Sequence, residues 1–350
     1  MSLMLDHEMS LFSDSALSLT ILELQNNIPG PESLSKASNS AEWEDVLTKS
    51  LEMREAAFSR CSVHELFQEF VKGDLLSIRG NILGPCHLRL LLYPLHSLVT
   101  HLTQLLSFAP LGAPGQRTWS SRTVSMNLQL EETTRLLQQW HKMAMYLCAD
   151  VNCPAWRANF VLHHVSALNL AVSIPDVESA ARTENSQSQC ENITLSLACQ
   201  LAIRDFPEAV FHSRQILQHL VAISPSLRPC WWSLALYRAT IALWACAMTI
   251  GTFEGVDANT VNILGSSNLT MSSLFSGNKL PCREQIALPV YDEGGTVSLE
   301  SAGGVLIHGL MVLGHQETSK LSQGVYRKIF GLGTRWGQLG YDGSGALKPL

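Results

Sequence analysis

Apolar residues in this chain recur mainly at spacings of three and four, which is the period of an amphipathic helix. Between His87 and Leu106 the leucines at 88, 91, 92, 95, 98, 102 and 105, with Val99, are expected to share one face of such a helix. The same period returns over 128–147, 191–204, 208–223, 231–250, 302–314 and 318–336. The pattern predicts an all-α fold.

Helix starts are signalled by capping residues. Ser62 is followed three positions later by Glu65, which forms a capping box ahead of an apolar run. Asp205 precedes a proline and Glu208, a sequence that offers a cap, a permitted early proline and a favourable acid. We also expect a helix to begin near Asn39 or Ser40.

Breaks in this pattern set the expected organisation. Residues 109–116 and the Gly-, Ser- and Asn-rich stretch 251–280 are predicted to be loops, the second of them long and flexible. Residues 285–300 read as a short extended excursion that turns at 293–295. We expect one large multi-helix domain over 36–340, after an acidic, Ser-rich segment at 1–35 and before a tail at 341–350.

The segment Trp231–Ile250 has the length and apolar composition of a membrane span. Arg238 lies near its middle, where a charge costs roughly 2.5–3.5 kcal/mol in a bilayer. No basic flank accompanies the segment. We therefore expect a helix buried inside a helical protein, and no membrane association.

The charge balance narrows the function classes. A net charge of −6 and the lack of dense Lys and Arg clusters argue against direct DNA binding by this chain. Asp6 and Glu8 stand where a secretory signal would carry basic residues. The nine cysteines are scattered without metal-ligand spacing, so we expect reduced, mostly buried thiols, with no metal site and no cofactor.

The adjacent pair His163-His164 is the strongest candidate for chemistry. Neighbouring helix positions point about 100° apart, which disfavours a shared metal ion. We expect both side chains to be core residues. His163, Ser166, Asn169 and Ser173 share a narrow polar stripe, which is either hydrogen-bonded internally or lines a small polar seam. His212 and His219 are expected on a solvated helix face. The sequence offers no assembled catalytic group.

Two further segments leave alternatives open. Residues 11–25 interleave acidic and apolar positions, which is typical of either an activation patch or a docked amphipathic helix, and we favour the docked helix. The tryptophans at 231, 232, 244 and 336 are expected to anchor a core. A small-molecule effector pocket between helices is the other interpretation.

Several segments, taken in order, carry a family resemblance. They are 153–170 (CPAWRANFVLHHVSALNL), 174–182, 229–244 (PCWWSLALYRATIALW), 290–299 and 324–336. In this order they resemble the regulatory domain of fungal-specific transcription factors, over roughly residues 35–340. In that family an N-terminal zinc module contacts DNA, and this chain departs from the pattern because it shows no such module.

The resemblance implies a nuclear regulator of transcription that acts through protein partners, either a DNA-binding factor or a second copy. It implies control of metabolic genes, with a secondary-metabolite cluster as the finer expectation, and it does not imply an enzyme. The alternative that the residues leave open is an all-α biosynthetic enzyme that uses His163 or His164 as an acid or base.

Overall fold

The structure is a computed structural model. It describes residues 2–13, 15, 23–25, 28, 38–52, 61–79, 83–107, 121–148, 150, 152–182, 189–253, 288–289, 296–297, 301–314, 319–336, 339–341 and 347–349. The loop predicted at 109–116, and all of the loop predicted at 251–280 apart from its first three residues, lie outside this set. Those first three residues belong to a helix that ends at Phe253.

The chain divides into two compact units. Unit 1 comprises residues 1–109 and 118–163, and unit 2 comprises residues 110–117 and 164–350. The division falls within α8 (Pro154–Ala171), between His163 and His164. The expected single domain over 36–340 stays a prediction.

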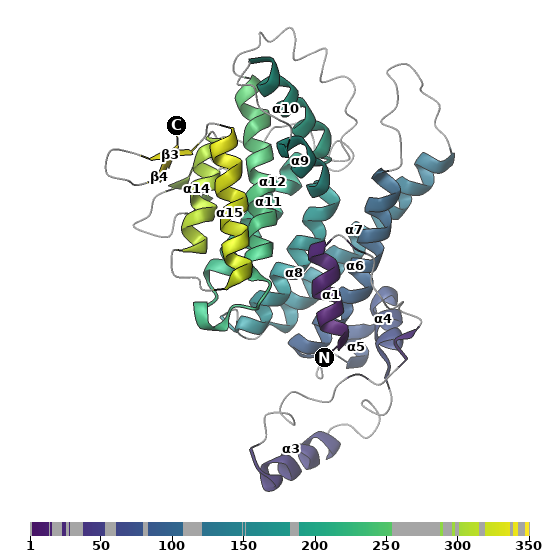
Figure 1. The fold of residues 1–350 in the computed structure, drawn as a ribbon. Helices are drawn as coiled ribbons and strands as arrows, with labels where there is room; N and C mark the ends of the chain where they lie inside the picture. The colour runs from purple at the N-terminus through teal and green to yellow at the C-terminus, as the bar shows by residue number, and fades with distance from the viewer. Residues whose placement is uncertain are drawn as a thin grey trace. The chain divides into compact units, whose positions relative to one another are not determined.

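Unit 1 is built on α6 (Pro85–Ser107), which corresponds to the predicted leucine-rich helix. Its other helices are α1 (Ser2–Ser13), α3 (Ser40–Glu52), α4 (Val63–Lys72), α5 (Leu75–Arg79), α7 (Ser121–Leu147) and the first part of α8. Helices α1, α4 and α7 pack against α6 (Figure 1). Trp140 of α7 is fully buried and donates its Nε1–H to the carbonyl of Leu88 in α6, at 2.9 Å.

The capping signals act as predicted. The Glu65 N–H donates to Ser62 Oγ at 3.1 Å, and the Ser62 N–H donates to the Glu65 carboxylate at 2.8 Å, which completes the capping box of α4. Asp205 caps α11 (Phe206–Val221) by accepting from the Glu208 N–H at 3.1 Å. Asn39 accepts from the Glu42 N–H at the start of α3.

Helix α1 is docked on α6 through its polar as well as its apolar side chains. Glu8 forms an ion pair with Arg89, and the hydroxyl of Tyr93 donates to Asp6 at 3.2 Å. His7 is buried, with its ring edge-on to Tyr93 at 6.0 Å. Asp6 and Glu8 of α1 therefore both bind side chains of α6.

Residues 11–25 are described only at 11–13, 15 and 23–25, so the docked-helix interpretation of this stretch stays a prediction. Leu11 is fully buried at the end of α1, and Leu24 packs in a small cluster with Val63, Leu90 and Tyr93. Most of the intervening residues lie outside the described set. An activation role for that stretch stays a prediction.

Unit 2 is built around α12 (Trp232–Phe253). Its other helices are the end of α8, α9 (Ile174–Arg182), α10 (Gln189–Ala202), α11, the 3-10 turn η2 (Pro225–Leu227), α14 (Ala302–Leu313) and α15 (Lys320–Arg335). Helices α9, α10, α11, α14 and α15 all contact α12. Figure 1 shows α14 and α15 alongside it.

Close packing in unit 2 depends on small residues, Gly309 among them, and on a buried cation. A Cβ at Gly309 of α14 would lie 2.7 Å from the side chain of Thr240 in α12, so only glycine permits this approach. Arg238 is buried in the middle of α12 and donates from Nη1 to Asn169 Oδ1 of α8 at 2.9 Å. The predicted polar stripe on α8 is thus hydrogen-bonded internally at Asn169.

Two short antiparallel hairpins accompany the helices. β1 (Leu288–Pro289) pairs with β2 (Thr296–Val297), with Leu288 opposite Val297, which confirms the predicted extended excursion. β3 (Leu339–Tyr341) pairs with β4 (Leu347–Pro349), and the sequence pattern missed this second hairpin. Both are small beside the helices, and the all-α prediction is confirmed.

Within α12, residues Trp232–Ile250 are long and apolar enough to cross a membrane by length and composition alone, with a mean hydropathy of 1.4. In this structure 78% of that window is buried inside the protein. A core helix of a helical protein meets the same criterion, and the sequence prediction of a buried helix is confirmed.

Replacing Arg238 by alanine should lower the free energy of unfolding by about 2–4 kcal/mol, because it leaves the Asn169 amide without this donor and opens space in the core. Urea denaturation followed by circular dichroism measures the change. Arg327→Ala, an exposed arginine on α15, is the matched control and should change stability by less than about 0.5 kcal/mol. Equal effects of the two changes would contradict this role for Arg238.

The docking of α1 should weaken as the pH falls. Burial, with nearby His96 and Arg89, holds the pKa of His7 well below its usual value, so His7 is neutral in the folded chain. The unfolded chain then binds more protons below about pH 6.5, and stability falls with decreasing pH by on the order of 1 kcal/mol. Thermal unfolding between pH 7.5 and 5 should show a smaller pH dependence in His7→Phe than in the parent chain; an unchanged dependence would count against this account.

Candidate functional site

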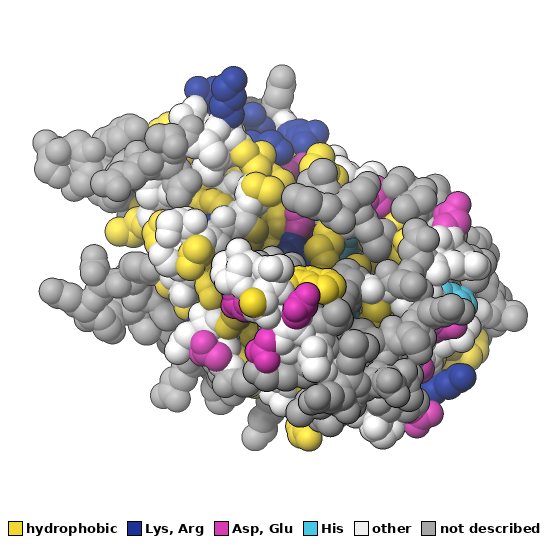
Figure 2. Space-filling model, turned by 90° about the horizontal axis from the view of Figure 1, so that it is seen from below, with side chains coloured by type: hydrophobic (Ala, Val, Ile, Leu, Met, Phe, Trp, Pro, Cys, Tyr) yellow, Lys and Arg dark blue, Asp and Glu magenta, His cyan; other side chains and the backbone are white. Residues whose placement is uncertain are grey.

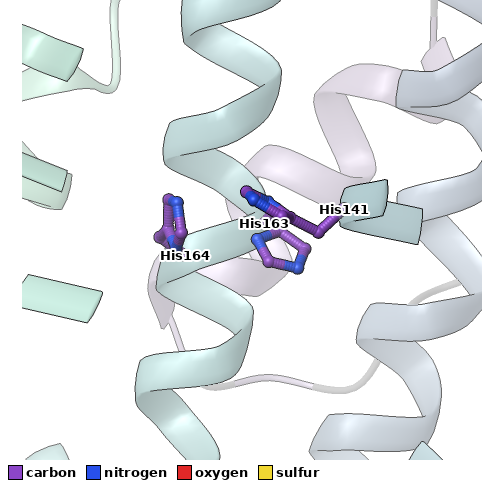
Figure 3. Close-up of side chains that lie close together, drawn as sticks. All are labelled: His141, His163 and His164. Carbon is purple, nitrogen blue, oxygen red and sulfur yellow. The ribbon is translucent and has the colours of Figure 1, made fainter. Parts of the chain in front are cut away.

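The two histidines that the sequence singles out, His163 and His164, both lie on α8 and leave it on different sides (Figure 3). Each is buried. The ring of His163 contacts Trp140 and His141 of α7, and the ring of His164 contacts His212 and His219 of α11. The contacts of each are therefore described within its own unit.

In unit 1, His163 packs against α7. Its Nε2–H donates to the carbonyl of Leu137 at 3.1 Å, and its ring stacks on Trp140 with the centroids 5.0 Å apart and the planes at 12°. The ring of His141 lies 5.2 Å from that of His163, and Figure 3 shows the two rings one above the other. The arrangement is that of a polar aromatic side chain used to join two helices.

In unit 2, His164 faces α11. Its Nδ1 lies 2.9 Å from Nδ1 of His212, and its ring stacks on His219 at 5.8 Å. His212 Nε2 is 3.1 Å from a carboxylate oxygen of Glu208, one helical turn earlier. The Glu208 carboxylate, the His212 ring and the buried His164 ring thus form a hydrogen-bonded series.

One proton of this group can be assigned from its geometry. The Glu208 carboxylate accepts from Nε2–H of His212, and this hydrogen bond holds the pKa of Glu208 below its usual value. The Nδ1 atoms of His212 and His164 share one hydrogen bond, in which one ring donates and the other accepts. The contact ties α8 to α11.

The prediction of a solvated face for His212 and His219 was wrong. Both side chains are half-buried and contact the ring of His164. Glu208 and His212 at spacing i, i+4 were a visible signal of a carboxylate–imidazole pair. Neither the stacking of His163 on Trp140 nor the role of His141 had a signal in the sequence.

Of the seven cysteines whose side chains the structure describes, three are buried, fewer than the sequence predicted. Cys61, Cys199 and Cys246 are buried, and burial raises the pKa of Cys199 to about 12 and that of Cys246 further still. Such thiols are poor nucleophiles. Cys230 is exposed, which departs from the expected burial.

A groove in unit 1 was not predicted. It has a volume of about 420 Å³ and lies between α4, α5 and α7. Its lining residues are Phe70, Gly73, Leu75, Leu76, Arg135, Gln138, Gln139, Lys142, Met143 and Tyr146. They include two cations and no carboxylate, so the groove combines an apolar floor with positive charge.

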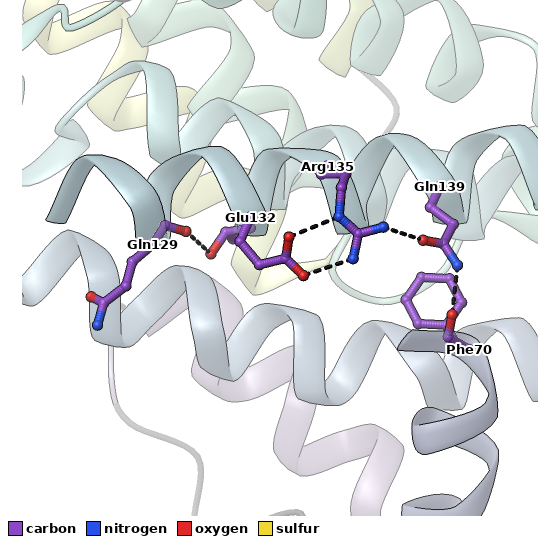
Figure 4. A network of polar contacts seen from close by, with 6 residues as sticks. Phe70, Gln129, Glu132, Arg135 and Gln139 are labelled. Carbon is purple, nitrogen blue, oxygen red and sulfur yellow. Dashed lines mark hydrogen bonds and ion pairs between the residues drawn. The ribbon is translucent and has the colours of Figure 1, made fainter. Parts of the chain in front are cut away.

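One wall of the groove is held by a hydrogen-bonded network (Figure 4). Arg135 donates to both carboxylate oxygens of Glu132, each at 2.7 Å, and to Gln139 Oε1 at 2.9 Å. Gln139 Nε2 in turn donates to the carbonyl of Phe70 at 2.5 Å. This chain of contacts holds α7 against the end of α4 and orients the guanidinium along the wall.

Comparison with curated proteins shows relatives among fungal transcription factors. Transcription factor 1 of Elsinoe fawcettii is 28% identical over 341 residues, which cover 93% of this chain and 34% of that protein. Transcription factor PfmaH of Pestalotiopsis fici is 28% identical over 341 residues, which cover 95% of this chain and 35% of that protein. A transcription factor of Zymoseptoria tritici is 33% identical over 266 residues, which cover 70% of this chain and 27% of that protein.

The chain spans about a third of the length of the curated relatives it matches. No protein-family model and no solved structure matches it. The comparisons therefore support the resemblance to fungal transcription factors at a coarse level, and the specific regulatory domain stays a prediction.

Replacing His163 by alanine should destabilise unit 1 by about 2–4 kcal/mol, because the change removes the stack on Trp140 and the donor to the Leu137 carbonyl. Chemical denaturation monitored by tryptophan fluorescence measures the loss. His101→Ala, an exposed histidine on α6, is the control and should be close to neutral. Full stability in His163→Ala would contradict the structural role.

Proposed function

We propose that this chain is the helical regulatory part of a fungal transcription regulator. The observation that carries the proposal is its collinear similarity, over more than nine-tenths of its length, to two fungal proteins named transcription factors. The order of segments that resembles the family's regulatory domain supports the same assignment. In this proposal the chain works in the nucleus.

The proposed mechanism is the docking of protein partners on a helical body. Large apolar side chains remain exposed on its surface, among them Ile193, Leu197 and Leu201, which recur every four residues along α10. Figure 2 shows hydrophobic side chains reaching one face of the molecule between acidic ones. With a net charge of −6, DNA contact is assigned to a partner, and a second copy of this chain is one such partner.

The regulated genes are proposed to be metabolic, with a secondary-metabolite cluster as the specific target.

The tryptophans at 231, 232, 244 and 336 are core anchors, since all four are buried. Trp336 donates its Nε1–H to the carbonyl of Ala181 at 3.2 Å, next to a second donor from Arg335. A small-molecule effector that binds between helices is compatible with this architecture.

We also propose that the chain is not an enzyme. The hydrogen-bonded series Glu208–His212–His164 is an observation that favours the alternative, since it joins a carboxylate to a buried imidazole. His164 is only 1% exposed, however, so a substrate would have to displace packed helices to reach it. Loss of stability without loss of a measurable turnover in His163→Ala and His164→Ala would remove the enzyme alternative.

Deleting the gene that encodes this chain should change the transcript levels of a limited set of genes, several of which lie together in one metabolic cluster. RNA sequencing of the deletion strain against the parent measures the change. Complementation with the intact gene is the control and should restore the parental levels. Unchanged transcripts under all growth conditions would defeat the proposal.

A reporter assay separates regulation from indirect effects. The chain fused to an unrelated DNA-binding domain should shift expression of a reporter that carries the matching sites, whereas that DNA-binding domain alone should not. The direction of the shift gives the sign of regulation.

A further inference from the structure

Two surfaces of unit 1 are complementary in charge, and both are exposed in the single chain. One is the groove between α4, α5 and α7, defined above by its ten lining residues. The other is the first half of α3, residues 40–45. Together they suggest how one copy of the chain contacts another.

The groove offers an apolar floor beneath two cations. Phe70, Leu75 and Met143 are buried at its base, whereas Tyr146 is 77% exposed at its rim. Lys142 is exposed, and Arg135 is fixed in the wall by the network of Figure 4. A suitable occupant carries an aromatic anchor flanked by carboxylates.

Helix α3 has that chemistry. Trp43 is 45% exposed, and it is followed directly by the exposed acids Glu44 and Asp45. Glu42 precedes it and accepts hydrogen bonds from the N–H and hydroxyl of Ser38, which hold its pKa below the usual value and keep it ionised. Three carboxylates therefore surround one tryptophan within a single helical turn.

We propose that α3 of one copy docks in the groove of a second copy, and that the second copy returns the same contact. The reciprocal arrangement has two-fold symmetry, so it closes as a dimer and does not grow into a filament. Trp43 supplies the apolar anchor against Leu76 and Tyr146, the exposed apolar residues of the lining, and the acids of α3 face Lys142. Each of the two contacts covers the α3 of one copy and the groove of the other.

This inference concerns assembly and does not depend on the proposed function. A regulator of transcription could work as a monomer, and a dimer could lack any regulatory role. Transcript measurements test the function, whereas sedimentation tests the contact. Failure of one therefore leaves the other standing.

Sedimentation velocity of the full chain across a wide range of concentrations should show a monomer–dimer equilibrium. Trp43→Ala and Lys142→Glu should each weaken association by about tenfold or more. Leu227→Ala and Lys320→Glu, which change an exposed leucine and an exposed lysine of unit 2, are matched controls and should leave it unchanged. Circular dichroism and the Tm of each variant check that it remains folded.

Mixing two charge variants gives the sharpest test. Chains with Lys142→Glu and chains with Glu44→Lys should each associate weakly alone. In a mixed dimer one contact is the parental one and the other has both signs reversed, so the mixture should recover association.

Three outcomes would overturn the proposal. They are a monomer at every concentration, a dimer indifferent to Trp43→Ala and Lys142→Glu, and a mixture no stronger than its components. A monomer whose α3 amides are protected from hydrogen exchange would instead assign α3 to its own groove.

Discussion

A helix that is apolar on every side must be covered on every side, and α12 places this constraint on unit 2. Among the described elements, helices α8, α9, α10, α11, α14 and α15 contact α12, and its side chains from Ala235 to Cys246 are almost all buried. The same cover encloses the guanidinium of Arg238, whose charge must then find a partner inside the protein, and Asn169 of α8 supplies it. The polar positions of α8 follow from the apolar surface of α12.

The buried histidines obey the same rule. An imidazole inside a helical core costs free energy unless its N–H groups find acceptors, and His163 and His164 meet this demand in different units, through a backbone carbonyl and through His212. The ring stacks on Trp140 and His219 add apolar contact to the polar one. These contacts explain why a motif that looks catalytic in the sequence belongs to the packing of the helices.

The proposed interactions with partners depend on the surface. The buried His163, His164 and Arg238 make internal contacts, whereas the groove of unit 1, helix α3 and the apolar row on α10 are exposed. An acidic overall charge and several exposed apolar surfaces suit the proposed regulator, which binds proteins and leaves DNA contact to a partner. The proposed reciprocal contact through Trp43 gives one of these surfaces a defined occupant.

The sequence by itself determined the all-α class, most helix bounds within a few residues, the caps at Ser62 and Asp205, and the burial of the segment around Arg238, because these depend on local periodicity and on hydrogen bonds within one turn. It also marked Glu208 and His212 at i, i+4, although that signal was misread as a solvated face. Three features join residues that lie 23 to 76 positions apart in the sequence. They are the pairing of Arg238 with Asn169, the stack of His163 on Trp140, and the groove lined by α4, α5 and α7. Only the tertiary structure decided these, because which helix faces which is set by how whole surfaces pack and not by any pattern within one of them.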